Sequence, residues 1–420
     1  MRFRPELSIM SRLLERFLRY VQVDTTAREG AQAYPSSPGQ LELGRMLLDE
    51  LLTLGWQANQ DKHGLVLASL PGNVPRELPA IVFNAHLDTS PETTGAGVRP
   101  QVWPNYNGQN LVLPGDPTKV LRVADNPEMA SLVGCTLITT DGTTLLGADD
   151  KAGVAVIMEA AARLCEAPEH VHGPVRLLFT CDEEIGRGID YVDVQALQAV
   201  ACYTLDGHGT GEIDVETFSA DLAVVTVRGV NIHPSIAKGR MINAVRAAAD
   251  FLARLPRDRL APECAEGREG FLHPYHIGGG VAEVVVRILL RDFETAALAD
   301  HAALLEAAAQ ATRAAWPGCE VFVEIRPQYR NMREGLAREP RAVAYAEEAM
   351  RRVGRTPRRT IVRGGTDGSR LTELGLPTPN LSTGEHNPHS VLEWTCLEEM
   401  EEAVRVVLAL CAVWAEGAEP

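Results

Sequence analysis

The stretch Leu146-Gly147-Ala148-Asp149-Asp150-Lys151-Ala152-Gly153 is the part of the sequence around which the rest is organised. Its adjacent acids lie where an apolar, strand-like run (143–146) meets a helix-like run (154–164). A carboxylate at such a junction lies near the carboxyl edge of a sheet and the positive end of a helix, which favours its ionised form. The position suits a metal ligand, although an isolated Asp-Asp pair more often caps a helix. Acids and histidines elsewhere in the chain decide between these interpretations.

The 420-residue chain has an ordinary globular composition, with 45% hydrophobic and 23% charged residues. Its length predicts two domains. The net charge of −16 argues against a nucleic-acid partner or an anionic membrane surface. The eight cysteines form no Cys-x-x-Cys pair, which indicates free thiols in a reducing compartment. Residues 1–23 carry charges throughout their apolar pattern, so we expect neither a signal peptide nor a membrane span, and a cytoplasmic protein.

Strand and helix patterns alternate along most of the chain, and polar residues collect where strands end. This arrangement predicts an α/β catalytic domain with a central β-sheet flanked by helices. The decisive strands are 80–85, which leads into His86-Leu87-Asp88; 175–180, which leads into Cys181-Asp182-Glu183-Glu184; and 199–205, which leads into Asp206-Gly207.

Between residues 216 and 327 the pattern changes and contains few candidate ligands. We predict strand 222–227, helix 241–255, strands 270–277 and 282–290, helix 295–316 and strand 320–325. The order β-α-β-β-α-β is that of the ferredoxin-like, split-βαβ unit. We therefore expect an inserted α+β domain at 216–327, with residues 1–215 and 328–420 forming the catalytic domain.

The strand ends and the C-terminal segment together supply two imidazoles and three carboxylates. If Asp149 bridges, each of two metal ions receives one histidine, one terminal carboxylate and one shared oxygen, which leaves room for a water molecule. Ligation by nitrogen and oxygen favours Zn²⁺, with Co²⁺ or Mn²⁺ as substitutes. Glu183 would be the general base that takes a proton from that water. The proposed ligands are His86, Asp149, Glu184, Asp206 and His389.

Several motifs in one order resemble those of the di-zinc exopeptidases, the family that includes carboxypeptidase G and succinyl-diaminopimelate desuccinylase. The motifs are His86-Leu87-Asp88, Gly147-Ala148-Asp149-Asp150-Lys151-Ala152-Gly153, Asp182-Glu183-Glu184-x-Gly186 and Asp206-Gly207. Further segments are similar to those of the tripeptide aminopeptidases of that family, and the resemblance covers nearly the whole chain. These segments are Leu137-Ile138-Thr139-Thr140-Asp141-Gly142, His233-Pro234-x-x-Ala237-Lys238-Gly239-x-Met241-x-Asn243-Ala244, Arg291-Asp292-Phe293, Tyr329-x-Asn331-Met332-Arg333-Glu334 and Arg363-Gly364-Gly365-Thr366-Asp367-Gly368.

The resemblance implies a role for each candidate residue. Asp149 would bridge two zinc ions, with His86 and Asp206 on one ion and Glu184 and His389 on the other. Asp88 would orient His86, and Glu183 would be the base. The inserted domain would be a lid that helps bind substrate and mediates a homodimer. On that lid His233 would approach the scissile carbonyl, and Arg291 and Arg363 would hold carboxylate or carbonyl groups of the peptide.

Two histidines depart from the family pattern. His208 stands where glycine is usual, and His386 is a second candidate near the final ligand. We choose His389 as the ligand because Glu393 follows it by four residues, as in the family. Either of the other histidines would be able to sit beside the metals and alter specificity.

The function implied is a metal-dependent aminopeptidase that releases the N-terminal residue from tripeptides by attack of metal-activated water. The alternatives are a dipeptidase, a carboxypeptidase or an N-acyl-amino-acid deacylase of the same fold, because metal ligands define the attack and not the substrate pocket. A non-catalytic binding module is disfavoured because Glu183 and all five ligands are present. A nucleotide site at Gly207-x-Gly209-x-Gly211 is disfavoured because no helix follows at once.

Overall fold

The computed structural model describes residues 5–167 and 169–417, and the chain divides into two compact units. The second unit comprises Glu216–Asn331 and Val362–Gly365, and the first comprises the rest. Residues 328–331 and 362–365, which we expected in the catalytic domain, belong to the second unit. The reason is backbone pairing: Tyr329 pairs with Ala220, and the Phe218 amide donates to the carbonyls of Val362 and Gly364.

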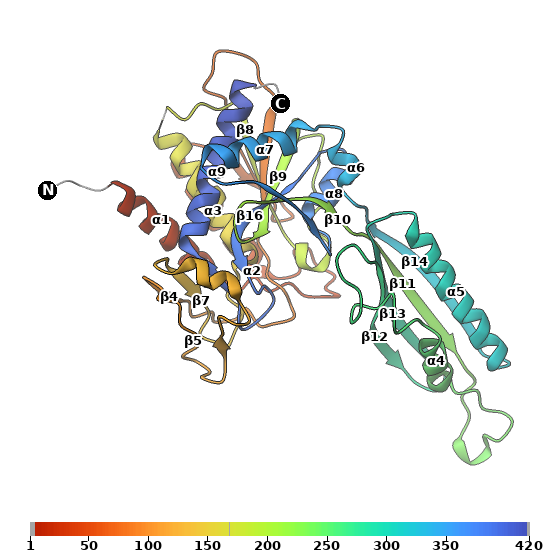
Figure 1. The fold of residues 1–420 in the computed structure, drawn as a ribbon. Helices are drawn as coiled ribbons and strands as arrows, with labels where there is room; N and C mark the ends of the chain where they lie inside the picture. The colour runs from red at the N-terminus through yellow and green to blue at the C-terminus, as the bar shows by residue number, and fades with distance from the viewer. Residues whose placement is uncertain (1–4, 168, 418–420) are drawn as a thin grey trace. The chain divides into compact units, whose positions relative to one another are not determined.

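The first unit contains most of the helices and a large mixed sheet (Figure 1). Its helices are α1 (Pro5–Tyr20), α2 (Pro38–Leu54), α3 (Ala148–Glu166), α6 (Arg333–Leu336), α7 (Arg341–Arg352), α8 (Asp367–Glu373) and α9 (Leu397–Glu416). Its strands are β1 (Gln57–Gln60), β2 (Val66–Leu70), β3 (Ala80–His86), β4 (Gln101–Trp103), β5 (Leu111–Val112), β6 (Val120–Leu121), β7 (Leu137–Thr139), β8 (Val175–Thr180), β9 (Ala199–His208), β10 (Glu212–Thr217), β15 (Arg358–Val362), β16 (Asn380–His386) and β17 (Trp394–Cys396).

The main sheet runs in the order β1-β2-β8-β3-β9-β16-β17-β7-β4. Strands β8, β3, β9 and β16 are mutually parallel and form its centre. Every residue of β3 and of β16 is buried, as expected for parallel strands covered on both faces. The predicted α/β fold with a helix-flanked central sheet is confirmed.

Alternate residues of the central strands enter two separate hydrophobic cores. Ile81 and Phe83 pack in the core that includes α3 and α9, two helices that lie side by side in Figure 1. Val82 faces the other way, into the core that includes Leu371 of α8. Because side chains repeat every second residue along a strand, one apolar run covers both faces of the sheet.

The parallel centre determines where polar side chains meet. The carboxyl ends of parallel strands lie at one edge of a sheet, where ligand sites of α/β folds are found. His86 ends β3, Glu183 and Glu184 follow β8, and Asp206 lies near the end of β9. The loop that carries His389 follows β16.

One expected element is absent from the described part of the chain. The apolar run 143–146 was expected to form a strand that pairs with the one before Asp141-Gly142; the earlier strand is present as β7, but residues 143–146 do not form a strand, so that expectation is wrong. The Leu145 amide donates to the Thr94 carbonyl, and the Leu146 amide donates to the Glu393 carboxylate. These groups replace a ladder of strand hydrogen bonds, and β7 pairs instead with β17 and β4.

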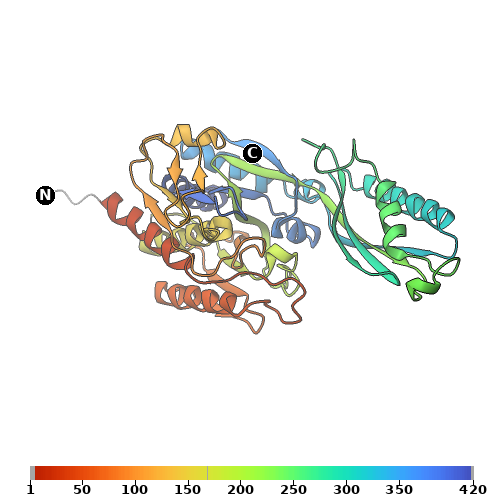
Figure 2. The same cartoon turned by 90° about the horizontal axis from the view of Figure 1, so that it is seen from below.

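The second unit is a four-stranded antiparallel sheet with two helices on one face (Figure 2). Its strand order, β12-β13-β11-β14, and its element order, β-α-β-β-α-β, are those of the ferredoxin-like fold that the sequence predicts. The elements are β11 (Ser219–Arg228), α4 (Ala244–Ala253), β12 (Phe271–Gly279), β13 (Glu283–Asp292), α5 (Ala297–Ala315) and β14 (Glu320–Tyr329). Within the described residues of both units, no helix combines the length and the apolar character needed to cross a lipid bilayer.

Candidate metal centre

Asp149 occupies the middle of a cluster formed at the carboxyl edge of the central strands. Its Oδ1 lies 2.9 Å from Nε2 of His86, and its Oδ2 lies 3.2 Å from Nε2 of His389. Nε2 of His86 also lies 3.7 Å from Oδ1 of Asp206, and Nε2 of His389 lies 3.0 Å from Oε2 of Glu184. The two oxygens of one carboxylate therefore face two separate sets of ligands, each with one imidazole and one further carboxylate.

Asp88 links the end of β3 to the turn that carries Glu183 and Glu184. Its Oδ1 accepts the Glu183 amide at 3.0 Å, and its Oδ2 accepts the Glu184 amide at 3.1 Å. Nδ1 of His86 lies 3.1 Å from the backbone carbonyl of Asp88 and 3.4 Å from the same Oδ1. Asp88 is fully buried. One carboxylate thus orients a histidine and holds the turn with both glutamates.

The backbone around Asp149 is held by a second buried carboxylate. Glu393 accepts the amides of Leu146 and Gly147 at 2.7 and 2.8 Å through Oε2, and that of Asp149 at 3.1 Å through Oε1. Asp150 points elsewhere: it accepts the His86 amide at 3.0 Å. The peptide bond between Asp149 and Asp150 is cis.

Two loop residues of the centre have left-handed backbone conformations. Asp182, which precedes Glu183, has a φ of 62°, and His389 also has a φ of 62°. Such angles are uncommon for residues other than glycine and persist where surrounding contacts impose them. Asp182 accepts the amide of Ser36 at 2.7 Å, and Thr93 donates to the His389 carbonyl at 2.6 Å. Both loops are therefore tied to distant parts of the chain.

The electrostatics of the centre come from several acids buried beside two histidines. Burial and the neighbouring Asp149 charge raise the pKa of Glu184 to about 8. Burial opposes ionisation of Asp149 as well, but hydrogen bonds from His389 and His86 bring its pKa well below the usual range. Burial also raises the pKa of Glu183 well above its ordinary value, although the charge of His86 opposes this. A carboxyl with a raised pKa suits general-base work near neutral pH.

The donor set fits a pair of divalent cations. Oε1 of Glu184 is buried without a hydrogen-bond partner, in a side chain only 5% exposed. A buried polar atom of this kind is costly unless something binds it. The groups that face one another are imidazole nitrogens and carboxylate oxygens, the donors that zinc, cobalt and manganese accept.

Replacing Asp88 with Asn should lower metal affinity or turnover by about 10- to 100-fold, the usual effect of a residue that orients a ligand. The amide side chain offers only one acceptor, so its NH₂ group would oppose one of the two glutamate amides. The measurement is zinc affinity by competition with a chelating dye, with turnover on the same samples. Asp116→Asn, in an exposed turn bonded to Thr118, is the matched control. Equal affinities in all three proteins would contradict the orienting role.

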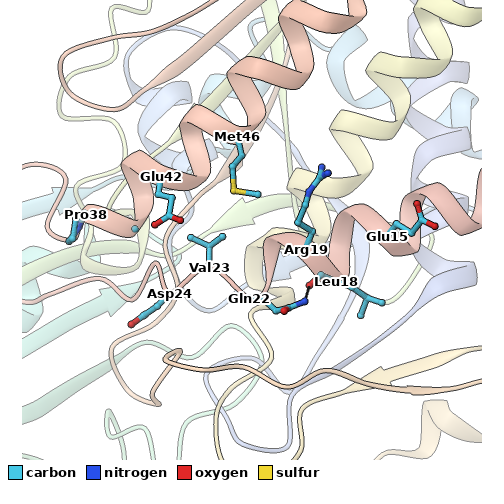
Figure 3. A pocket seen from close by; sticks show the side chains of 10 residues that line it. Glu15, Leu18, Arg19, Gln22, Val23, Asp24, Pro38, Glu42 and Met46 are labelled. Carbon is cyan, nitrogen blue, oxygen red and sulfur yellow. Dashed lines mark hydrogen bonds between the residues drawn. The ribbon is translucent and has the colours of Figure 1, made fainter.

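An open groove of about 750 Å³ lies between the end of α1 and the start of α2 (Figure 3). Side chains of Glu15, Arg19, Glu42 and Met46 line it, and none of the predicted ligands is among its lining residues. The candidate metal centre is therefore identified by the chemistry of its side chains, and it does not coincide with this groove.

The chain is similar in sequence to known proteins over nearly its whole length. A family model for peptidase family M20/M25/M40 matches residues 140–412. A peptidase T of Desulfitobacterium hafniense is 44% identical over 407 residues, which cover 97% of this chain and 99% of that protein. The chain belongs to the M20 peptidase family. The family resemblance seen in the motifs, and the prediction of a peptidase, are confirmed.

Solved structures of M20 proteins share the fold. A tripeptidase of Staphylococcus aureus matches with a TM-score of 0.75 at 22% identity, over 97% of this chain and 99% of that one. A dinuclear metal-binding M20 peptidase of Bacillus subtilis matches with a TM-score of 0.64 at 15% identity, over 98% of this chain and 100% of that one. At these identities the likeness concerns the fold.

The predicted substrate-binding residues of this M20 protein lie in the second unit. Arg291 and Arg363 are neighbours there, since Nη1 of Arg291 donates to the Arg363 carbonyl at 3.4 Å. Nε of Arg291 is buried without a hydrogen-bond partner. His233 lies on an exposed loop after β11, where its Nδ1 is 2.7 Å from the Ser235 hydroxyl.

His386 takes a different position from His389. Its Nε2 lies 2.7 Å from Glu399, and its ring stacks on Trp394 with centroids 3.7 Å apart. His208 is exposed, two residues beyond Asp206, whose pKa is raised by burial and by the neighbouring Asp149 charge. His389, and not His386, therefore reaches Asp149.

Sequence reasoning missed some residues of the centre. The sequence pattern uses Glu393 to identify His389 as the ligand and does not predict that Glu393 binds the amides around Asp149. It likewise does not predict that Asp150 accepts the His86 amide. Asp367, whose pKa burial raises to about 7, accepts the Thr180 hydroxyl at 2.5 Å. Glu385 also lies in the cluster. One feature of the sequence could have indicated Glu385. It is the single charged residue of the segment Leu381-Ser382-Thr383-Gly384-Glu385, which ends a predicted strand.

Proposed function

We propose that this M20 peptidase is a two-metal aminopeptidase that releases the N-terminal residue from tripeptides. The observation that carries the proposal is the carboxylate of Asp149, whose two oxygens face two imidazoles, one at the end of β3 and one on the loop after β16. The relative that is 44% identical over nearly the whole chain is a peptidase T, which supports the substrate class.

Each ion would be held by residues already in place. His86, Asp206 and Oδ1 of Asp149 would hold one ion, and His389, Glu184 and Oδ2 of Asp149 would hold the other. Zn²⁺ suits this donor set, with Co²⁺ or Mn²⁺ as substitutes. When bound, such ions polarise a peptide carbonyl and make water more acidic.

The remaining chemistry is proton transfer by Glu183. Its turn is held by Asp88, which accepts the backbone amide of Glu183 at 3.0 Å. Charges of His86, Asp206 and Glu184 act on this carboxyl, which supports a role at the same centre. Glu183 would take a proton from the attacking water and deliver it to the leaving amine.

The second unit would serve as the lid. Arg291 and Arg363 are the candidates for peptide carboxylate or carbonyl groups, and His233 for the scissile carbonyl. If so, Arg363→Ala should raise KM more than it lowers kcat, and an unchanged KM would argue against the assignment.

Strand β12 is an edge strand with Tyr275 and Ile277 exposed, which supports a homodimer through this unit. Sedimentation as a monomer at micromolar concentration would contradict the dimer. We further propose a cytoplasmic location.

A substrate panel tests the reaction. Free di-, tri- and tetrapeptides of one series, each with an N-acetylated counterpart, should show the highest kcat/KM for the free tripeptide. Acetylation should remove most of that activity, because an aminopeptidase binds the free α-amine. Preference for acetylated substrates would indicate a deacylase, and preference for free dipeptides a dipeptidase. Release of the C-terminal residue first would indicate a carboxypeptidase.

A further inference from the structure

Glu385 is a buried carboxylate at the end of β16, and none of the roles described so far includes it. Only 2% of the residue is exposed. The hydroxyl of Thr383 donates to its Oε1 at 2.7 Å, which fixes the orientation of the carboxylate. In the neighbouring parallel strand its partner is His208, two residues beyond Asp206. This pairing brings the end of β16 beside the end of the strand that carries Asp206.

The carboxylate of Glu385 reaches the centre itself. One oxygen each of Asp149, Asp206 and Glu385 lie within 4.8 Å of one another. Three carboxylates at such separations, one buried and two half-buried, repel one another unless a cation lies among them. In the same centre the buried Oε1 of Glu184 has no hydrogen-bond partner, an independent sign that these acids are arranged around cations.

We propose that Glu385 is a further ligand of the metal ion that His86 and Asp206 hold. The assignment rests on the proposed two-metal centre. It makes the two positions unequal: His86, Asp149, Asp206 and Glu385 on one ion, against His389, Glu184 and Asp149 on the other. The four carboxylates of the combined set carry a formal charge of −4, which two divalent cations balance.

The inequality has a chemical consequence. The ion beside Glu385 has more oxygen ligands and more negative charge around it than the ion beside His389. Oxygen-rich sites favour harder cations such as Mn²⁺, whereas imidazole suits Zn²⁺. This position should therefore be the tighter of the two and the more tolerant of Mn²⁺.

The alternative is a purely structural carboxylate, held by Thr383 and buried with it. The two roles predict opposite effects of Glu385→Gln on the metal-free protein. A structural carboxylate stabilises the fold in the absence of metal, so its loss lowers the melting temperature in chelator. A ligand among like charges destabilises the metal-free fold, so its loss raises that temperature or leaves it unchanged.

The test uses the full chain, stripped with chelator and dialysed against buffered Zn²⁺ or Mn²⁺ over a range of free concentrations. Bound metal per chain is measured by mass spectrometry, and melting temperature with and without metal. Wild type should bind two ions, and Glu385→Gln should weaken one of them by at least about tenfold. The double variant Glu385→Gln with Asp206→Asn should still bind the ion that His389 and Glu184 hold. The double variant Glu385→Gln with Glu184→Gln should bind both ions more weakly. Glu401→Gln, which removes a carboxylate bonded to Arg163, is the control and should leave both affinities unchanged.

The outcomes separate the two proposals. Two ions bound by wild type with unchanged affinities in Glu385→Gln would overturn the assignment of Glu385 alone, as would a lowered melting temperature of that variant in chelator. Failure of wild type to bind two ions would overturn the two-metal centre and, with it, the role of Glu385.

Discussion

Replacing Glu183 with Gln should reduce tripeptide hydrolysis by about 10²- to 10⁴-fold while leaving the metal content unchanged. The amide is close to the carboxylate in size but has no basic oxygen to take a proton from water. The turn itself should persist, because Asp88 holds it through backbone amides that the substitution leaves in place. Single-turnover hydrolysis, with metal analysis of the same preparation, measures both effects.

The adjacent residue supplies the control for this experiment. Glu184→Gln should lose metal as well as activity, because its carboxylate faces His389 at 3.0 Å. Excess Zn²⁺ should restore part of the activity of Glu184→Gln and none of that of Glu183→Gln. Substantial turnover by Glu183→Gln, or its rescue by metal, would remove the base assignment.

Asp149→Ala should lose both metal ions, and all measurable activity with them. Each ion would share this carboxylate, because one of its oxygens lies 2.9 Å from His86 and the other lies 3.2 Å from His389. Asp206→Asn, by contrast, should weaken one ion only. Equilibrium dialysis that found one tightly bound ion in Asp149→Ala would show that this residue does not bridge.

The neighbouring acid makes a matched control for folding. Asp150 is fully buried and accepts the His86 amide, so Asp150→Asn changes the same peptide segment without removing the bridge. It should lower the melting temperature yet retain two ions at saturating Zn²⁺. Loss of both ions from Asp150→Asn as well would mean that Asp149→Ala acts through the fold of the segment.

The central strands and the polar residues after them could be predicted because both signals are local. A buried parallel strand reads as a short apolar run, and the run at 175–180 coincides with β8. The order of the second unit could be predicted for the same reason. A strand at 143–146 could not be excluded in this way. An apolar run whose backbone amide donates to a side chain has the same sequence pattern as one whose amides donate to a neighbouring strand.

The supports of the centre could not be predicted because their partners are remote in sequence. Glu393 holds the amide of Asp149 from 244 residues away, and Asp182 accepts from Gln40 across 142 residues. Periodicity contains no information about such pairs. Glu385 was missed because a single acid at a strand end is ordinarily a solvated residue.

The order of the ligands along the chain bears on how the protein matures. His86, Asp149 and Asp206 are synthesised first, and the whole stretch Glu216–Asn331 follows before the ribosome reaches His389. A nascent chain therefore contains four of the five proposed ligands, Glu184 among them, well before the fifth. Domains generally fold as units during synthesis, but the first unit here cannot be completed until its C-terminal strands and α9 emerge. On the proposed ligand set, completion of the centre would therefore wait for the C-terminal segment, which carries both Glu385 and His389.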